Sequence, residues 1–463
     1  MPSEIENDEL SFDNLTPIYN LFSKGKYKEA LSSLDTLSQK FPNNHNLYSI
    51  GAECYFALDQ YELSISCHDE SIKLNPYCAD YFNNKSNALE KLRKFDEAIS
   101  CCKKAIEIRP DFDLAFYNLG INAKHLRLYD LSLDSLNMAI QLDPDNEKYK
   151  FAKATLLLLY EDFKNGWLLF ESRWKVDNLY SPKIDSNYPT WTGNKNAKLL
   201  VWPEQGIGDH ILYSALIPEL KKKCSNLTIL VDRRLVDLLS RSMGNLCTIY
   251  PATIQYSELD YDEQISMGSL CQYLRNDEKD FLTTRNGFLK DDKIKTLEFK
   301  EDLLALCSQS NNKICGISWR SQTLGVGVHK SISLKNMIEI LDLKGYTFVS
   351  LQYGDTLDEI KEVKNELGID IISFKKVDNF NDIDGLASLI QSCDTIISID
   401  NVTCQLAGAL GKEIHILLTL GSWWGWGVNR SDSPWYNSVK IYRQETNETI
   451  SCLIKKLNEN FKI

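Results

Sequence analysis

The first third of the chain repeats one pattern of apolar, small and proline positions every 34 residues. The prolines are Pro42, Pro76, Pro110 and Pro144. An aromatic side chain lies 15 residues before each proline and once more beyond the last, at Tyr27, Tyr61, Phe95, Tyr129 and Phe163. A small residue follows each ring after three positions, at Ala30, Ser64, Ala98, Ser132 and Gly166. Small residues in phase with rings and prolines are typical of helices that pack closely in pairs, so the pattern predicts five helical hairpins.

This register resembles the tetratricopeptide repeat family. One hairpin cannot bury its apolar face alone, so neighbouring hairpins stack into a superhelix whose concave side usually docks another protein. The resemblance therefore implies a repeat superhelix over residues 11–180 and a protein partner that it binds.

A different pattern begins after Gly166, where the 34-residue period ends. A polar stretch from Ser181 to Lys198 is typical of a connector. Beyond it, short apolar runs alternate with amphipathic stretches, which indicates βαβ units and parallel sheets in one or two further domains. The candidate strands are Leu199–Trp202, Leu227–Val231, Ile314–Ser318, Thr347–Leu351, Thr395–Ile399 and Ile414–Leu418.

The composition limits the cellular compartment in which the protein is expected and the classes of partner that it can bind. A formal charge of −12 provides no basic field for a nucleic-acid backbone. The 13 cysteines are odd in number and contain no CxxC pair, so we expect free thiols in a reducing compartment. The acidic start, Met1 to Asn14, lacks the features of a signal peptide, and no window is apolar enough to span a membrane. We expect a cytoplasmic protein without a transmembrane segment.

We expect the functional site to begin at Leu199, where a strand is followed by a glycine-containing turn and a helix. Gly206-x-Gly208 after a strand is consistent with a dinucleotide fold, with Asp232 ending the next strand. Ile211, however, stands where the third glycine of that fingerprint should allow close helix packing, which disfavours an NAD enzyme.

A second resemblance fits this segment better. Gly206-Ile-Gly208-Asp209 followed by Ile217-Pro-x-Leu220 resembles the amino-terminal motif of the ADP-heptose:lipopolysaccharide heptosyltransferase family, which has the GT-B glycosyltransferase fold. The aspartate of that motif is the family's proposed general base, so the resemblance makes Asp209 the catalytic candidate on a glycine turn. An aspartate just before an apolar helix can also serve only as a helix cap, and this alternative stays open.

Two later segments extend the resemblance to the donor side. Gly316–Arg320 is a strand that leads through a loop with Gly325 and Gly327 to His329 and Lys330, which matches the family's phosphate-facing lysine; a solvent-exposed loop lysine is the alternative. A second strand ends at Asp400, and the helix after it offers a positive amino terminus suited to a pyrophosphate, although its small residues would also suit helix–sheet packing. The implied donor-binding residues are Ser318, Arg320, Lys330, Asp400, Asn401, Thr403 and Gln405.

The resemblance covers roughly residues 198 to 445. It implies an α superhelix of tetratricopeptide repeats followed by an α/β GT-B fold of two Rossmann-like domains, with the acceptor side over 198–300 and the nucleotide-sugar donor side over 312–463. The Trp423–Trp426 tract resembles the carboxy-terminal signature of repeat-bearing bacterial glycosyltransferases, although its tryptophans would also suit core packing. The overall plan is similar to that of O-linked N-acetylglucosamine transferases.

The resemblance implies an inverting transferase in which fixed positive charge stabilises the departing diphosphate and a carboxylate deprotonates the acceptor hydroxyl. The nucleotide-sugar is a co-substrate, and no metal is expected, because Asp382-x-Asp384 directly precedes an apolar helix and suits a helix cap. The sugar stays open among hexosyl, heptosyl and acetylhexosaminyl groups. Three positions depart from the family patterns: Pro203, His210 and Gln405.

Three functions compete at this point. The first is transfer of the sugar to a protein that the repeats dock. The second is transfer to a glycan or lipopolysaccharide, with the repeats assembling a complex. The third is a noncatalytic adaptor with a decayed transferase domain, which the retained aspartate, lysine and Asp-Asn-x-Thr set disfavours.

Overall fold

The computed structural model describes residues 12–176, 183–282, 285–307, 313–322, 327–341, 345–420, 423–446 and 448–461. The chain divides into two compact units, Met1–Leu156 and Leu157–Ile463. Two positions of the sequence analysis, Ser181 at the start of the connector and Gly325 in the loop before Lys330, lie outside the described residues.

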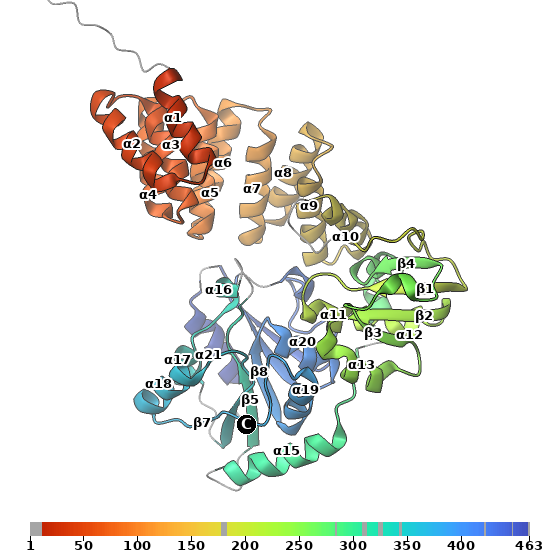
Figure 1. Ribbon diagram of the computed structural model, residues 1–463. Coiled ribbons are helices and arrows are strands. Elements are labelled where there is room, and N and C mark those ends of the chain that lie inside the picture. The colour runs from red at the N-terminus through yellow and green to blue at the C-terminus, as the bar shows by residue number, and fades with distance from the viewer. Residues whose placement is uncertain are drawn as a thin grey trace, which may run out of the picture. The chain divides into compact units, whose positions relative to one another are not determined.

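The predicted hairpins are present, with ten helices over residues 12–170, all of them described (Figure 1). The first helices of the pairs are α1 (Phe12–Ser23), α3 (His45–Ala57), α5 (Ala79–Lys91), α7 (Asp113–His125) and α9 (Glu147–Leu159). The second helices are α2 (Tyr27–Lys40), α4 (Tyr61–Leu74), α6 (Phe95–Ile108), α8 (Tyr129–Leu142) and α10 (Phe163–Phe170). Each aromatic position of the 34-residue pattern is the first residue of a second helix.

The turn inside each hairpin has the same backbone conformation. One residue per turn is left-handed, with φ between 58° and 72°: Gly25, Asp59, Arg93, Arg127 and Glu161. A residue in this conformation ends a helix, because it turns the chain so that the next N–H groups bond back to carbonyl oxygens of the helix's last turn. Only the first of the five residues is glycine. Because the other four residue types do not signal a left-handed turn, the sequence did not reveal this second 34-residue period.

The small positions of the pattern lie where the paired helices meet. All five of them are buried. At Gly166, a Cβ atom would come within 2.7 Å of the Leu158 side chain, which shows why no larger residue fits there. The apolar clusters of the first unit are small and join adjacent helices, as expected for a repeat architecture in which each hairpin contacts its neighbours.

The second unit contains two sheets in which all described strand pairs are parallel. The first has the order β3-β2-β1-β4 and the second β10-β9-β8-β5-β6-β7, which is the strand order of a Rossmann fold. The strands are β1 (Ala197–Trp202), β2 (Cys224–Val231), β3 (Thr248–Pro251), β4 (Glu263–Ser266), β5 (Lys313–Ser318), β6 (Tyr346–Ser350), β7 (Ile371–Ile372), β8 (Thr395–Ile399), β9 (Ile414–Leu418) and β10 (Val439–Arg443). All six predicted strands are present, and the four that the sequence missed are the edge strands.

Helices cover both faces of the six-stranded sheet (Figure 1). Helices α17 (Leu334–Ile340), α18 (Leu357–Leu367) and α21 (Ile450–Phe461) lie on one face, over an extended apolar cluster of that sheet. Helices α19 (Ile383–Ser392) and α20 (Val402–Ala409) lie on the other. The remaining helices of this unit are α11 (Ile207–Ser214), α12 (Ile217–Leu220), α13 (Val236–Met243), α14 (Cys271–Leu274), α15 (Lys293–Leu306) and α16 (Gly327–Lys330), with short 3-10 turns such as η1 (Glu171–Lys175) and η4 (Gly268–Leu270).

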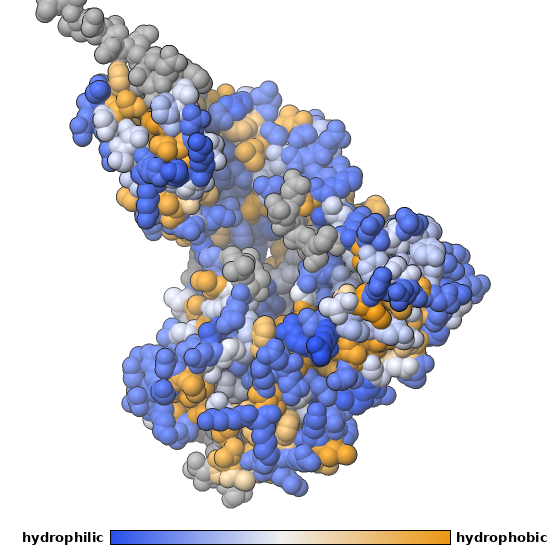
Figure 2. All heavy atoms as spheres, viewed as in Figure 1, coloured by the Kyte–Doolittle hydropathy of each residue, from blue (hydrophilic) through white to orange (hydrophobic). Residues whose placement is uncertain are grey.

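Hydrophilic residues dominate the visible surface, with scattered apolar spots (Figure 2). Within the described residues, no helix combines the length and apolar character that crossing a bilayer requires.

Two glycines in the first helices of the repeats test the close packing of the hairpins. In Gly120→Ala the new Cβ would lie 2.7 Å from Leu136 Cγ, so we expect the free energy of unfolding to fall by about 1–3 kcal/mol. In Gly51→Ala the nearest atom is 3.9 Å away, so the helix preference of alanine should raise stability by about 0.5–1 kcal/mol. Urea denaturation of both variants measures the difference, and equal effects would contradict this account of the packing.

Candidate functional site

The predicted site residues lie at the carboxyl ends of parallel strands in both sheets. Asp209 belongs to α11, which follows β1, Lys330 ends α16, which follows β5, and Asp400 follows β8 directly. Helices α11 and α20 contact each other, so the two strand-end regions face one another (Figure 1). Ligand sites of open α/β sheets occur at such strand ends, where the strand order reverses.

Asp209 occupies the third position of α11 and caps it. Its Oδ2 accepts the N–H of Gly206 at 3.3 Å, so the capping alternative describes part of its role. Burial raises the pKa of Asp209 to about 7, and the carboxylates of Glu204 and Asp400 act in the same direction against Lys330 and the Gly206 N–H. A carboxylate with a pKa near neutrality can exchange protons at physiological pH, which a general base requires.

Lys330 and Asp400 form a buried ion pair, with Nζ 2.7 Å from Oδ2. Burial alone would lower the pKa of Lys330, but the Asp400 carboxylate outweighs it and raises this pKa above its ordinary value. Burial likewise opposes ionisation of Asp400, yet the Lys330 cation and two N–H donors hold the pKa of Asp400 below its ordinary value. Both groups are therefore charged at neutral pH. Because the Lys330 side chain is only 16% exposed, the solvent-exposed loop lysine does not fit.

The tryptophan tract completes the shell around Asp400. The Trp423 backbone N–H donates to Oδ2 and the Trp426 indole N–H donates to Oδ1, both at 2.8 Å. Trp424 packs edge-on against Trp167 and Phe170 of α10. The tract therefore packs against α10 through the half-buried Trp424 and orients the Asp400 carboxylate through Trp423 and the buried Trp426.

The other predicted donor-side residues mostly hold the strand ends together. Asn401 caps α20 by accepting the Thr403 N–H at 3.0 Å, and its amide donates to Ser318 Oγ at 2.7 Å. Gln405 accepts the Tyr436 hydroxyl at 2.9 Å. Arg320 lies 3.2 Å from Glu359 and donates to the Asp355 carbonyl oxygen. The Asn401 contacts fix the amino terminus of α20 at the point between β5 and β8 where the strand order reverses.

In the glycine turn, the left-handed backbone conformation lies at Gln205 and not at a glycine. Gln205 has φ 61°, whereas Gly206 is extended with φ −95°. At Gly208 a Cβ would make only ordinary contacts, 3.6 Å from Gln405 Cγ and 3.9 Å from Val402 Cγ2, so the packing of the turn against α20 does not itself require glycine there.

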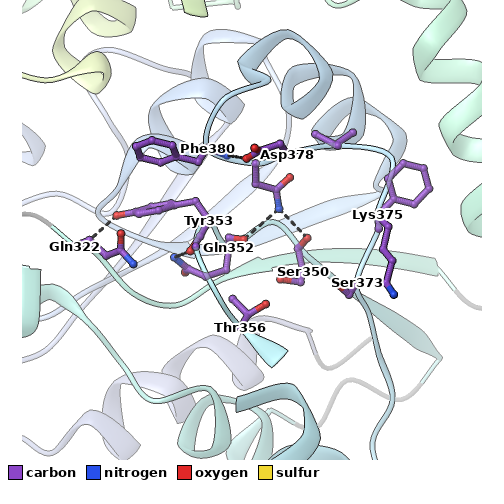
Figure 3. Close-up of a pocket in the computed structure, with 13 residues that line it drawn as sticks. Gln322, Ser350, Gln352, Tyr353, Thr356, Ser373, Lys375, Asp378 and Phe380 are labelled. Atoms are coloured by element: carbon purple, nitrogen blue, oxygen red, sulfur yellow. Dashed lines mark hydrogen bonds between the residues drawn. The ribbon is translucent and has the colours of Figure 1, made fainter. Parts of the chain in front are cut away.

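A cavity of about 460 Å³ lies beyond the ends of β5, β6 and β7 (Figure 3). Its lining residues are Gln322, Ser350, Gln352, Tyr353, Gly354, Thr356, Ser373, Phe374, Lys375, Val377, Asp378, Asn379 and Phe380. The Gln322 N–H donates to the Tyr353 hydroxyl at 2.8 Å, and the Asn379 amide donates to two carbonyl oxygens of the β6 end. None of these residues was predicted from the sequence, in which the only signal was a polar Gln-Tyr-Gly after a buried strand.

Asp382 is the N-cap of α19, as predicted, whereas Asp384 is the second residue of that helix. Asp382 accepts the Gly385 N–H at 2.7 Å, and Asp384 forms an ion pair with Arg241 of α13. Across the described residues, no group of three or more His, Cys, Asp or Glu side chains could hold a metal ion.

Two residues beside Asp209 were not assigned a role from sequence. His210 is buried, its Nδ1 accepts the Asp232 N–H at 3.1 Å, and burial lowers its pKa to about 4. Glu204, between β1 and the glycine turn, is fully buried and paired with Arg173. An acidic residue next to a glycine turn was the only signal for Glu204.

Comparison with known proteins gives two kinds of match. Residues 79–112 match the family described as Tetratricopeptide repeat, so the repeat is present in this chain. A stretch of 314 residues, 64% of this chain and 52% of the relative, is 29% identical to Protein FlbA of Caulobacter vibrioides (strain ATCC 19089 / CIP 103742 / CB 15). The chain thus spans about half the length of that relative.

Two of the similar solved structures each cover about a third of this chain or less. The MamA 41-end structure from Desulfovibrio magneticus RS-1 is 19% identical, with a TM-score of 0.33 over 34% of this chain and 89% of that one. The Arabidopsis OM64 TPR domain is 25% identical, with a TM-score of 0.24 over 24% of this chain and 93% of that one.

The buried, neutral His210 predicts a pH-dependent stability of the second unit. A lowered pKa means that its stabilisation is complete above pH 6.5 and is lost as the pH falls toward 4, by about 3 kcal/mol in total. His210→Asn keeps an acceptor for the Asp232 N–H but cannot titrate. Urea denaturation at pH 7 and pH 4.5 should show a smaller acid loss in the variant, and an identical loss would contradict the assignment.

Proposed function

We propose that this chain is an inverting, metal-independent glycosyltransferase of the GT-B type that moves a sugar from a nucleotide-activated donor to a protein docked by the repeats. One observation carries the proposal: Asp209, a helix-capping aspartate with a pKa of about 7, faces the buried Lys330–Asp400 pair across the strand ends of two parallel sheets. The family resemblance of these residues supports the same reading.

The nucleotide-sugar donor would bind at the strand ends of the six-stranded sheet. The cavity beyond β5, β6 and β7 is of ligand size and is lined by three aromatic residues, Tyr353, Phe374 and Phe380, whose rings offer stacking surfaces for a nucleobase. The amino terminus of α20 and the Lys330 ammonium suit the diphosphate, because both present positive charge. Arg320, two residues before the cavity residue Gln322, adds a further cation to this side.

In the proposed reaction, residues at the strand ends of the two sheets have different roles. Asp209 takes the proton of the acceptor hydroxyl, and the oxygen forms a bond to the anomeric carbon on the face opposite the diphosphate. The sugar–phosphate bond breaks, and its electron pair leaves with the diphosphate, whose charge Lys330 stabilises. Attack from the opposite face inverts the anomeric configuration.

The repeats supply the argument for a protein acceptor. Tetratricopeptide repeats indicate a role in protein interaction. A cleft between two α/β domains can hold a small acceptor without help, so a superhelix of five hairpins is best explained by a macromolecular one.

The Asp209→Asn variant tests the enzyme. We expect the protein to release nucleoside diphosphate from one member of a panel of nucleotide sugars, and the variant to lose at least about a hundredfold in kcat. Because the base must be ionised, kcat/KM of the unmodified protein should rise with pH through about 7, and this limb should be absent in the variant.

The control for this variant is ligand binding. Nucleoside diphosphates should raise the melting temperature of both proteins equally, since the donor contacts lie on the other sheet. A variant that melts lower but keeps its turnover would show that Asp209 is only a cap. Failure of every nucleotide sugar to react or bind would favour the noncatalytic adaptor.

Removing the first four hairpins tests the acceptor. A chain that begins at Glu147 keeps the α9–α10 pair, whose Gly166–Leu158 contact is tight, and keeps Arg173. We expect it to release nucleotide slowly from the donor into water but to lose modification of the protein acceptor.

The truncated chain must first be monodisperse and give the diphosphate-induced thermal shift of the full protein, because removing repeats exposes apolar surface. With that control met, full retention of acceptor modification would move the assignment to a glycan-directed transferase.

A further inference from the structure

Arg173 lies at the strand ends of the four-stranded sheet, in the crevice where the strand order of that sheet reverses. The chain runs from β1 to β2 and β3 on one side and then returns to β4 on the other, so the strand order reverses between β1 and β4. Ser266 ends β4 and Ser269 follows it in η4, and the Arg173 Nη2 donates to both hydroxyls, at 3.2 and 2.9 Å. The position where such a sheet usually binds a ligand is therefore filled by an arginine from η1, directly after α10.

Every N–H group of this guanidinium has an acceptor. Nε and Nη2 form a fork with the Glu204 carboxylate, at 2.9 Å each, and Nη1 donates to Glu171 at 2.7 Å and to the Phe170 carbonyl at 3.1 Å. The rings of Phe170 and Trp174 lie 4.5 and 4.3 Å from the guanidinium carbon. The side chains of Arg173 and Glu204 are both fully buried.

Glu204 joins this cluster to the turn that presents Asp209. It lies between β1 and Gly206, the residue whose N–H binds the Asp209 carboxylate. Space for its own carboxylate exists only because residue 268 is glycine, since a Cβ there would come within 1.9 Å of Glu204 Oε1. The main chain from Glu204 to Asp209 is thus tied at one end to a guanidinium outside the sheet.

We propose that Arg173 is a positioning residue, which fixes the Glu204–Asp209 turn and so holds Asp209 in place for proton transfer. This inference rests on the proposed function for its chemistry, but the holding of the turn is a separate, measurable property. It also makes the η1 segment after the last hairpin a required part of the catalytic unit.

The chain offers a matched pair for comparison. Arg275 is as deeply buried, donates to both oxygens of Glu219 at 3.0 Å, and lies over the Phe281 ring at 5.3 Å. Glu219 belongs to α12, away from the turn. Arg275→Lys therefore removes the same kind of fork in the same half of the unit.

The experiment compares Arg173→Lys with Arg275→Lys in the full chain. We expect both to melt at lower temperature. Only Arg173→Lys should speed backbone hydrogen exchange in peptides covering 203–212, at least tenfold, and lower kcat at least tenfold with an unchanged KM for the donor. The thermal shift produced by a nucleoside diphosphate should be unchanged in both.

A second variant covers the case in which Arg173→Lys does not fold. Glu204→Gln keeps the shape of the side chain but removes a negative charge near Asp209, so the acid limb of kcat/KM should move to lower pH. The charged or titratable groups that act on Asp209 or that it acts on are Glu204, Lys330, Asp400, Tyr213 and Tyr436. Of these, the substitution changes only the first.

The outcomes separate the two proposals. Equal exchange in 203–212 for both arginine variants overturns the positioning role, as does faster exchange with an unchanged kcat. An unmodified protein that reacts with no donor overturns the proposed function instead, and the exchange data then still decide whether Arg173 holds the turn.

Discussion

The second unit is organised by the need to neutralise carboxylates that are buried at strand ends. Asp400 and Glu204 have almost no solvent contact, and an unpaired ionised carboxylate in such a position is strongly unfavourable. Each is compensated by a cation and by directed N–H groups: Lys330 with two tryptophan donors for Asp400, and the Arg173 fork for Glu204. These requirements bring together chain segments that are far apart in sequence.

The last hairpin belongs to this charge-compensating core as much as to the repeats. The boundary between the compact units falls inside α9, and α10 lies in the second unit. Its Trp167 and Phe170 pack against Trp424, whose neighbour Trp426 binds Asp400, and Arg173 after it binds Glu204. The continuous segment of α10 and η1 thus supports the surroundings of both carboxylates, although α10 follows the repeat pattern at Phe163 and Gly166.

Sequence periodicity identified the repeat helices and the interior strands of the two sheets. The repeat helices carry a 34-residue apolar register, and the six interior strands are continuous apolar runs, so both were predictable. The four missed strands lie at sheet edges, where partial exposure allows residues such as Glu263 and Lys440 and breaks the apolar run. The placement of Asp209, Lys330 and Asp400 near one another came from a motif resemblance. Arg173 and the cavity beyond β6 could not be found this way, because each depends on contacts between segments distant in sequence.

The capping contact of Asp209 is compatible with its proposed role as a general base. Capping fixes the carboxylate through a single N–H bond to Oδ2, and it leaves acceptor capacity on Oδ1, which has a lone pair to take a proton. The same N–H bond favours the ionised form, whereas burial and two neighbouring carboxylates oppose it, and the balance sets the pKa near 7. A cap exposed to water would keep an ordinary acidic pKa and would be a weak base. What distinguishes this aspartate from an ordinary helix cap is therefore its charged and desolvated surroundings, to which Glu204, held by Arg173, contributes directly.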